Sequence, residues 1–325
     1  MIVVTGGAGF IGSAVVWALN KKGFDNILVV DELGTSEKWK NLVNLKFADY
    51  EEKDNFIKNI LYENKVYGEL IEGIIHMGAC SATTEKNASY LIGNNYQYSQ
   101  VLAQWCAVHK KKFVYASSAA TYGDGEKGFN DDHSLLEKLQ PLNMYAYSKH
   151  MFDMWALKKG LLDKIAGIKF FNVFGPNEYH KEDMRSLVHK AYGQIKQTGK
   201  LKLFKSYKKD YPHGGQVRDF IYVQEAVEMV LFAYEKALGG IYNAGTGIAR
   251  SFEDLGSAVF TAMGAKKNME YIEMPVEIRD KYQYYTQAKM DKLKAAGYKQ
   301  GPPNLEGNVK TYVQEFLMQK DSYLK

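Results

Sequence analysis

The amino-acid sequence predicts an α/β fold in which a doubly wound parallel sheet carries helices on both faces and a smaller α/β domain lies beside it. Two observations carry this prediction. Short β-branched segments alternate with longer amphipathic segments through the first 172 residues, and the first segment leads directly into a glycine-rich turn at residues 6–12. Parallel strands need a crossover of a dozen or more residues between them, which a helix usually supplies. The expected architecture is therefore of the Rossmann type.

The expected elements follow one another in regular order through the first half of the chain. Five segments have the length and β-branched composition of buried strands, and four amphipathic segments are long enough to be helices. The strands are expected at residues 2–5, 27–31, 74–77, 113–117 and 168–172, and the helices near residues 11–21, 53–62, 90–109 and 145–159.

The glycine-rich turn combines two overlapping spacings. Gly6, Gly9 and Gly12 form a G-x-x-G-x-x-G pattern, and Gly7, Gly9 and Gly12 form the tighter G-x-G-x-x-G pattern. Glycine is needed there because the backbone must turn sharply and bring the amides of a helix amino terminus close to phosphate oxygens. Since the turn follows a strand and opens an amphipathic helix, the sequence predicts a dinucleotide-binding site.

The choice between NAD and NADP depends on the end of the second expected strand. Asp31 lies where a carboxylate accepts hydrogen bonds from the ribose hydroxyls of adenosine, about 20 residues after the turn, and this favours NAD. Lys38 and Lys53 are close enough in the sequence for loops to bring one of them to the 2′-phosphate of NADP. The residues alone leave both cofactors open.

A tyrosine and a lysine four residues apart form the candidate proton-transfer pair. On a helix, Tyr145 and Lys149 point to one face, where the ammonium favours the tyrosinate. Tyr147 has Met151 as its partner at the same spacing and is not a candidate. Ser118 follows an expected strand at the carboxyl edge of the sheet, where ligands bind, and we expect its hydroxyl to bind the reacting oxygen.

The alternating pattern loosens after residue 172. A charged segment at 183–197 predicts a helix, and strand-like segments at 219–223 and 241–244 are expected to return beside the main sheet. The predicted dinucleotide-binding domain consists of residues 1–172 and about 217–245. The predicted substrate-binding domain is discontinuous and consists of about 173–216 and 246–325.

Composition excludes several classes of protein. The chain has 325 residues, of which 46% are apolar and 24% charged, and the net charge of +5 is dispersed along the sequence. This argues against a nucleic-acid partner. No segment approaches the ~18 apolar residues of a membrane span, and the chain enters the glycine turn at once, so we expect a cytoplasmic protein without a membrane partner. Cys80 and Cys106 lack metal-site spacing, and we expect reduced thiols and no metal.

These elements together resemble the extended short-chain dehydrogenase/reductase family, whose members act on nucleotide sugars. A closer similarity, to the members that epimerise ADP-heptoses at C6″ in lipopolysaccharide core biosynthesis, covers the whole length of the chain. The residues that carry it are Gly78 to Glu85, Asn94 to Ser99, Asn172 to Pro176, Arg218-Asp219-Phe220, Tyr282-Gln283 and Thr286-Gln287-Ala288.

The resemblance implies NADP as the cofactor, with NAD as the second choice, because Glu32 replaces an expected neutral residue. It adds to the glycines of the turn a set of further cofactor contacts. With those glycines, the set is Gly6, Gly9, Phe10, Ile11, Gly12, Asp31, Glu32, Lys38, Lys53, Met77, Gly78, Ala79, Cys80, Ser81, Asn94, Lys149 and Val173.

The resemblance also implies an ADP-heptose site. Asp183 stands where a small hydroxyl residue is expected and Lys190 where a histidine is expected, although His189 is adjacent. With these two positions, the implied substrate contacts are Asn172, Lys181, Asp183, Lys190, Phe204, Lys205, Ser206, Tyr207, Arg218 and Tyr282. The family also implies a homo-oligomer, a pentamer being one candidate.

The implied reaction interconverts ADP-D-glycero-D-manno-heptose and ADP-L-glycero-D-manno-heptose. The hydrogen at C6″ is not acidic, so inversion requires transient oxidation to a ketone, rotation, and return of the same hydride. Because the oxygen occupies two positions, two proton-transfer residues are needed, and we assign Tyr145 and Lys181, assisted by Lys149 and Ser118. The Arg218 guanidinium is expected to bind the diphosphate.

Three alternative functions were weighed. A nucleotide-sugar 4,6-dehydratase needs an Asp-Glu pair beside the serine, and this chain has Ala119 and Ala120 there. A UDP-hexose 4-epimerase, or a related nucleotide-sugar oxidoreductase, is open as an alternative because it uses the same chemistry. A dinucleotide-sensing regulator is the non-enzymatic alternative, but it has no need of Tyr145, Lys149 and Ser118 together.

Overall fold

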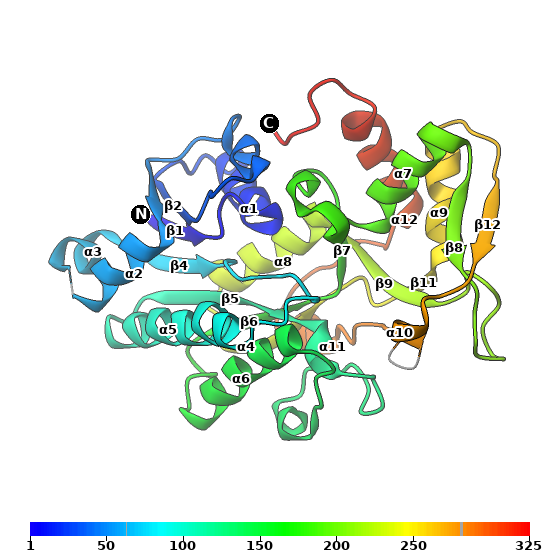
Figure 1. Ribbon diagram of the computed structural model, residues 1–325. Coiled ribbons are helices and arrows are strands. Elements are labelled where there is room, and N and C mark those ends of the chain that lie inside the picture. The colour runs from blue at the N-terminus through cyan, green and yellow to red at the C-terminus, as the bar shows by residue number, and fades with distance from the viewer. Residues whose placement is uncertain (63, 280–281) are drawn as a thin grey trace.

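A computed structural model describes residues 1–62, 64–279 and 282–325 of the chain (Figure 1). The strands are β1 (Ile2–Thr5), β2 (Ile27–Asp31), β3 (Asp49–Glu52), β4 (Gly73–His76), β5 (Lys112–Ser118), β6 (Ala166–Phe170), β7 (Asn172–Phe174), β8 (Leu201–Phe204), β9 (Val217–Tyr222), β10 (Gly240–Ala244), β11 (Ala249–Ser251) and β12 (Met269–Ile272). The helices are α1 (Phe10–Lys21), α2 (Lys53–Leu61), α3 (Lys65–Leu70), α4 (Ala88–Leu91), α5 (Tyr98–Val108), α6 (Met144–Lys158), α7 (Leu187–Thr198), α8 (Val223–Glu235), α9 (Phe252–Ala262), α10 (Val276–Arg279), α11 (Asp291–Ala295) and α12 (Leu305–Thr311). Short 3₁₀ helices cover Glu37–Leu42, Ala119–Tyr122, His133–Lys138 and Tyr179–Met184, and π-helical turns cover Ile92–Gln97 and Tyr312–Leu317.

A parallel sheet of seven strands forms the centre of the molecule, in the order β10-β6-β5-β4-β1-β2-β3. Every residue of β1 and β2 is buried. Strands that are covered on both faces need apolar side chains throughout, which explains the continuous Ile, Leu and Val segments in the sequence. This confirms the predicted fold class.

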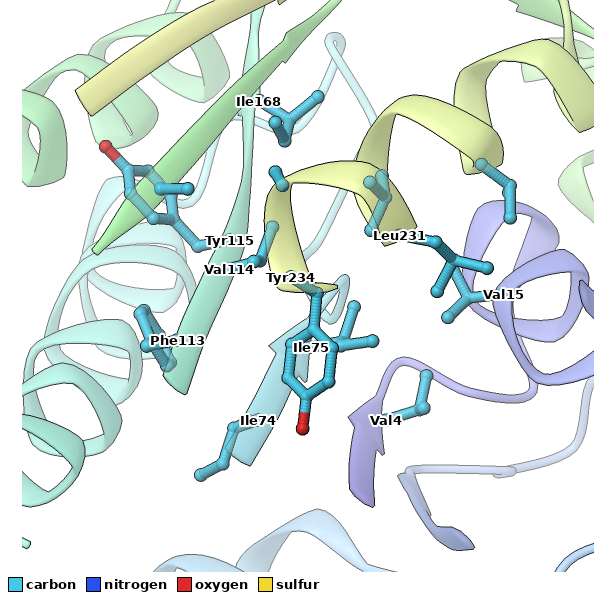
Figure 2. Packing of buried hydrophobic residues seen from close by; sticks show 14 of the residues in the cluster. Val4, Val15, Ile74, Ile75, Phe113, Val114, Tyr115, Ile168, Leu231 and Tyr234 are labelled. Carbon is cyan, nitrogen blue, oxygen red and sulfur yellow. The ribbon is translucent and has the colours of Figure 1, made fainter. Parts of the chain in front are cut away.

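Helices cover both faces of this sheet. Helices α1 and α8 pack against each other on one face, and α2, α5 and α6 lie on the other (Figure 1). Figure 2 shows Val15 of α1 and Leu231 of α8 approaching Val4 and Ile75 of the sheet, where they form part of one continuous apolar core. The carboxyl ends of the parallel strands are thereby held at one common edge.

The expected strand at 219–223 does not join the main sheet, which corrects the prediction. The observed strand β9 pairs with β7 in parallel and with β11 in antiparallel orientation. The main sheet has no place for it there, because β6 is already paired with β5 on one side and with β10 on the other. The chain leaves β6 at Phe170, and β7 begins the smaller sheet two residues later.

Several other elements differ from the sequence prediction. The expected helix at 183–197 begins only at Leu187, because the Ser186 hydroxyl caps it by accepting a hydrogen bond from the amide of His189. The expected helix at 90–109 is continuous but contains a π-helical turn between α4 and α5. The polar edge strand β3 lacks a hydrophobic pattern, and the pair β8-β12 has only four residues in each strand; none of these strands was predicted.

A second hydrophobic cluster lies outside the main core. It includes Phe174 of β7, Val188 of α7, Leu201 of β8, Val259 of α9 and Tyr312. The division into two domains, with the boundaries given above, stays a prediction. In the part of the chain that the structure describes, no helix combines the length and apolarity that crossing a bilayer requires.

A fully buried ion pair lies behind the carboxyl end of β5. The Lys169 ammonium is 2.6 Å from a carboxylate oxygen of Asp153, and neither side chain is exposed to solvent. The same carboxylate accepts hydrogen bonds from the hydroxyls of Ser117 at 2.8 Å and Tyr115 at 2.9 Å. These contacts join β5, β6 and α6 at one point.

Replacing Lys169 with Met is expected to lower the free energy of unfolding by about 3–5 kcal/mol, because it leaves the Asp153 carboxylate buried without its counter-charge. Urea denaturation monitored by circular dichroism measures this effect. The matched control is Lys22→Ala, which removes an exposed ion pair with Glu235 and should change the free energy of unfolding by less than about 0.5 kcal/mol. Equal changes in the free energy of unfolding for the two substitutions would show that the buried ion pair stabilises the fold no more than the exposed one.

Candidate active site

A cavity of about 570 Å³ opens at the carboxyl edge of the main sheet. It is formed where the loops after β1, β2, β4 and β5 meet, which is where ligands bind in open parallel sheets. All the cofactor contacts implied by the resemblance line this cavity: Gly6, Gly9, Phe10, Ile11, Gly12, Asp31, Glu32, Lys38, Lys53, Met77, Gly78, Ala79, Cys80, Ser81, Asn94, Lys149 and Val173. Their individual roles in binding stay predictions.

The glycines of the turn are required by the close approach of two backbones. A Cβ atom on Gly6 would lie 2.6 Å from the backbone of Gly78 in the loop after β4, and Gly6 has a positive φ of 65°. A Cβ atom on Gly12 would lie 2.0 Å from the carbonyl oxygen of Gly6. Any side chain at these positions would force the turn away from the sheet. The amino terminus of α1 therefore faces the cavity, in the arrangement that binds phosphate.

Two acid and lysine pairs line the part of the cavity beyond β2. The Asp31 carboxylate accepts hydrogen bonds from the amide of Ala8 at 2.8 Å and from the Lys38 ammonium at 2.7 Å. The Lys53 ammonium is 2.5 Å from the Glu32 carboxylate, and this hydrogen bond lowers the pKa of Glu32. Asp31 thus holds the glycine turn through the amide of Ala8, and each of the two acids forms an ion pair with a lysine.

Asn95 contacts the loop after β4, a role that was not predicted from the sequence. It lies fully buried on the π-helical turn before α5. Its side chain accepts a hydrogen bond from the amide of Cys80 at 2.8 Å and donates to the carbonyl of Cys80 and the hydroxyl of Ser148, both at 3.0 Å. It therefore joins the loop after β4 to the first turns of α6. The adjacent asparagines Asn94 and Asn95 in the middle of the predicted helix were the available signal.

The predicted proton-transfer group on α6 comes together as expected. Tyr145, Lys149 and Ser118 all line the cavity. The buried Lys149 ammonium donates a hydrogen bond to the carbonyl of Ala116 at 2.9 Å, and burial lowers its pKa to about 8. We expected Lys149 to lower the pKa of Tyr145, but burial raises the pKa of that phenol, and the Ser118 side chain opposes this shift only in part.

Lys181 reaches the same cavity from a different part of the chain. It lies on the 3₁₀ helix Tyr179–Met184, and its ammonium is 5.3 Å from the centre of the Phe10 ring. Burial lowers the pKa of Lys181, and the negative charge of Glu178 opposes the shift. The cavity therefore has a phenol from α6 and an amine from the loop after β7, each of which can exchange a proton.

A group of the implied substrate contacts forms a separate cluster. The Phe204 and Tyr282 rings are 6.3 Å apart and edge to face, and the Arg218 guanidinium lies 5.4 Å from the Tyr282 ring. Arg218 is nearly buried and donates hydrogen bonds to the carbonyls of Val217 and Gln283. Arg218 lies on β9 and Phe204 on β8, and none of the three residues belongs to the lining of the cavity described above.

The remaining implied contacts also lie outside that cavity lining. The Lys190 ammonium donates to the carbonyl of Asp183 at 2.6 Å, so these two exposed residues contact each other. Lys205 pairs with Glu273 at 2.7 Å. The other three are Asn172, exposed at the start of β7, Ser206, whose amide donates to His213, and Tyr207, whose amide donates to Tyr284. Among the described residues, no three His, Cys, Asp or Glu side chains gather in a metal-binding arrangement.

Comparison with known proteins agrees with this geometry. The sequence model of the NAD dependent epimerase/dehydratase family matches residues 2–245. The chain is 51% identical over 325 residues to the ADP-L-glycero-D-manno-heptose-6-epimerase of Nitratidesulfovibrio vulgaris strain DP4, covering 100% of both chains. It is 48% identical over 334 residues to the protein of the same name from Fusobacterium nucleatum subsp. nucleatum, again covering 100% of both.

A solved structure is similar to the whole molecule. The crystal structure of Helicobacter pylori ADP-L-glycero-D-manno-heptose-6-epimerase superposes with a TM-score of 0.81 at 27% identity, covering 97% of this chain and 95% of that one. The glycine turn, the serine, tyrosine and lysine of the cavity, and the full-length similarity lead to one conclusion. The chain belongs to the NAD dependent epimerase/dehydratase family.

Proposed function

We propose that the protein interconverts ADP-D-glycero-D-manno-heptose and ADP-L-glycero-D-manno-heptose by transient oxidation at C6″, in lipopolysaccharide core heptose biosynthesis. One observation supports this most directly: Tyr145 and Lys181 come from different elements and line the same cavity as the glycine turn. The names of the full-length relatives point to the same substrate. The residues also fit a dinucleotide, because the cradle at Gly6 and Gly12 has no room for a Cβ atom.

The mechanism requires two proton-transfer groups. A nicotinamide dinucleotide bound at the glycine turn supplies reversible hydride transfer at C6″. Tyr145 or Lys181 takes the proton from the hydroxyl, and the other residue returns a proton to the oxygen after the ketone has rotated. A single group cannot serve both orientations, because proton transfer needs hydrogen-bond distance in each. Burial favours the neutral amine of Lys181, which can accept a proton.

The other residues bind and orient the two ligands. In this proposal, Lys149 holds the nicotinamide ribose and Ser118 holds the reacting oxygen. Arg218 neutralises the diphosphate of the substrate, and Tyr282 helps to hold the nucleotide sugar. Movement of the outer cluster toward the cavity on binding is part of the proposal, since the two sets of residues are separate in the structure.

NADP is the cofactor that we propose, on the basis of Lys38 and Lys53. Each lysine is paired with an acid at 2.7 Å or less, so both cations are held at the part of the cavity that follows β2. The 2′-phosphate of NADP can attract either cation, whereas NAD offers neither of them an anion there. A cytoplasmic location and a homo-oligomer, such as a pentamer, stay proposals as well.

Incubation with each ADP-heptose epimer in deuterated water tests the proposed reaction. We expect either epimer to give the same mixture of both, without deuterium at C6″, because the hydride that leaves the carbon also returns to it. Chromatography and mass spectrometry measure the mixture and the isotope. UDP-galactose is the comparison substrate: faster conversion of UDP-galactose would replace our proposal with a UDP-hexose 4-epimerase, and incorporated deuterium would indicate enolisation.

Tyr145→Phe is expected to slow the interconversion about 10²- to 10⁴-fold, because the phenol no longer exchanges a proton with the substrate. Dinucleotide affinity, measured by calorimetry, should change little. Tyr147→Phe is the matched control, since Tyr147 lies on the same helix but is 49% exposed, and it should retain full activity. If both variants turn over at the wild-type rate, the phenol has no role in the reaction. If the unmodified protein binds the dinucleotide but converts no ADP-heptose, a dinucleotide-sensing regulator becomes the better explanation.

Lys53→Met is expected to weaken NADP binding about tenfold or more, because a charge-assisted hydrogen bond to phosphate is lost. NAD affinity should change much less, so the ratio of NADP affinity to NAD affinity falls. Calorimetric titration with both dinucleotides measures the two affinities. Lys46→Met removes an exposed lysine outside the cavity and is the control. Tighter binding of NAD than NADP by the unmodified protein would contradict the proposed preference.

A further inference from the structure

The loop that carries Lys181 has a strained backbone. Residues 177–186, here called the lysine loop, join β7 to α7. Two non-glycine residues in it have positive φ angles, Asn177 at 73° and Glu182 at 46°. Such conformations are unfavourable for residues with a Cβ atom and persist only where surrounding contacts impose them. The placement of Lys181 therefore depends on what holds this loop.

Much of that support comes from the last residues of the sequence. The amide of Leu324 donates to the side-chain oxygen of Asn177 at 3.1 Å, and the Tyr179 hydroxyl donates to the carbonyl of Ser322 at 2.5 Å. The Tyr179 and Tyr323 rings meet edge to face at 5.2 Å. Residues 322–325, here called the strap, thus contact the lysine loop through both backbone and side-chain groups, at positions two and four residues before Lys181.

The strap is also attached to the helix that follows the glycine turn. The indole nitrogen of Trp17 on α1 donates to the carbonyl of Lys325 at 2.8 Å, and Leu324 is buried in the main core. Asn177 itself donates to the Ser13 hydroxyl of α1 at 2.9 Å. Figure 1 shows the red carboxyl-terminal end lying near the blue amino-terminal elements. The lysine loop is therefore fixed relative to the helix whose amino terminus faces the cavity.

We propose that the strap positions Lys181 for its proton transfer, with Tyr179 and Asn177 as the positioning residues through which it acts. The proposal rests on the proposed function of Lys181. Residues 322–325 are not among the residues that line the cavity, so the strap acts on it through the elements that it contacts, and of these the lysine loop carries Lys181. Proton transfer needs hydrogen-bond distance, and a displacement of about 1 Å can cost a hundredfold in rate.

The surroundings of Lys181 mean that loosening the lysine loop should change the pKa of its amine. Phe10 of α1, the buried carboxylate of Glu178 and the neighbouring His180 are the groups that face or adjoin its amine. The Glu178 carboxylate is itself held by the Tyr312 hydroxyl at 2.9 Å and by the Ser186 hydroxyl at 2.6 Å. Burial lowers the pKa of Lys181, so a loosened loop that admits water should raise that pKa toward its ordinary value.

Two variants test the strap. Deleting residues 322–325 removes all its contacts, and Tyr179→Phe keeps the ring but removes the hydroxyl that donates to the carbonyl of Ser322. We expect epimerisation to fall about ten- to a hundredfold in the deletion and less in Tyr179→Phe, with dinucleotide affinity unchanged. The low-pH limb of the rate should move to higher pH, because less of Lys181 is then in the neutral form at a given pH. Tyr242→Phe is the matched control. The Tyr242 hydroxyl also donates to a backbone carbonyl, that of Gly239, but Tyr242 lies on strand β10, away from the lysine loop.

A second measurement does not depend on activity. Competitive labelling of amines, read by mass spectrometry across pH, reports the pKa of Lys181 in the unliganded protein, and hydrogen exchange reports the protection of residues 177–186. The deletion should raise that pKa and increase exchange there, while β1 and α1 stay protected. Unchanged labelling and exchange would overturn the strap proposal even if the wild-type protein is active. If both change but the wild-type protein converts no ADP-heptose, the strap stands as a structural support and the proposed function fails.

Discussion

The close contact between the glycine turn and the loop after β4 is the constraint on which the rest of the site depends. With a hypothetical Cβ of Gly6 only 2.6 Å from Gly78, these two backbones have no space for side chains between them. The contact sets where α1 begins, and hence where its free amides face the cavity. It also brings the loop of residues 77–81 to the position at which Asn95 can hold it. A larger residue at Gly6 would disturb all of these features at once.

Three lysines at or near the cavity show how burial can lead to different chemical roles. Lys169 is fully buried against Asp153 and joins strands to a helix, so its charge is compensated. Lys149 donates to a neutral carbonyl, and burial lowers its pKa to about 8. Lys181 lies against an aromatic ring, and burial lowers its pKa as well. Among the described residues, neither Lys149 nor Lys181 forms an ion pair like that of Lys169, and burial makes an ammonium without such a pair give up its proton more easily, which suits proton transfer better than structural support.

The cofactor site could be predicted more completely than the substrate site. The predicted dinucleotide contacts follow strand ends in a regular order, and the parallel sheet brings all strand ends to one edge. Phe204, Arg218 and Tyr282 have no such common frame, because they lie on the smaller sheet and the segments around it. The strand containing Arg218 was expected beside the main sheet, although β6 has no free edge to accept it. Asn95 was missed because its role depends on the distant Cys80 and Ser148.

The sequence by itself determined the α/β class, the order of the central elements and the identity of the glycine turn with its Tyr145 and Lys149 partners. These features depend on local periodicity and on spacing along one helix or turn, which the order of residues encodes directly. Only the tertiary structure decided that β9 belongs to a second sheet, that Asp31 fastens the turn while paired with Lys38, and that residues 322–325 support the loop of Lys181. Each of these depends on contacts between residues far apart in the sequence, whose partners are chosen by packing and by the need of buried polar groups for hydrogen bonds.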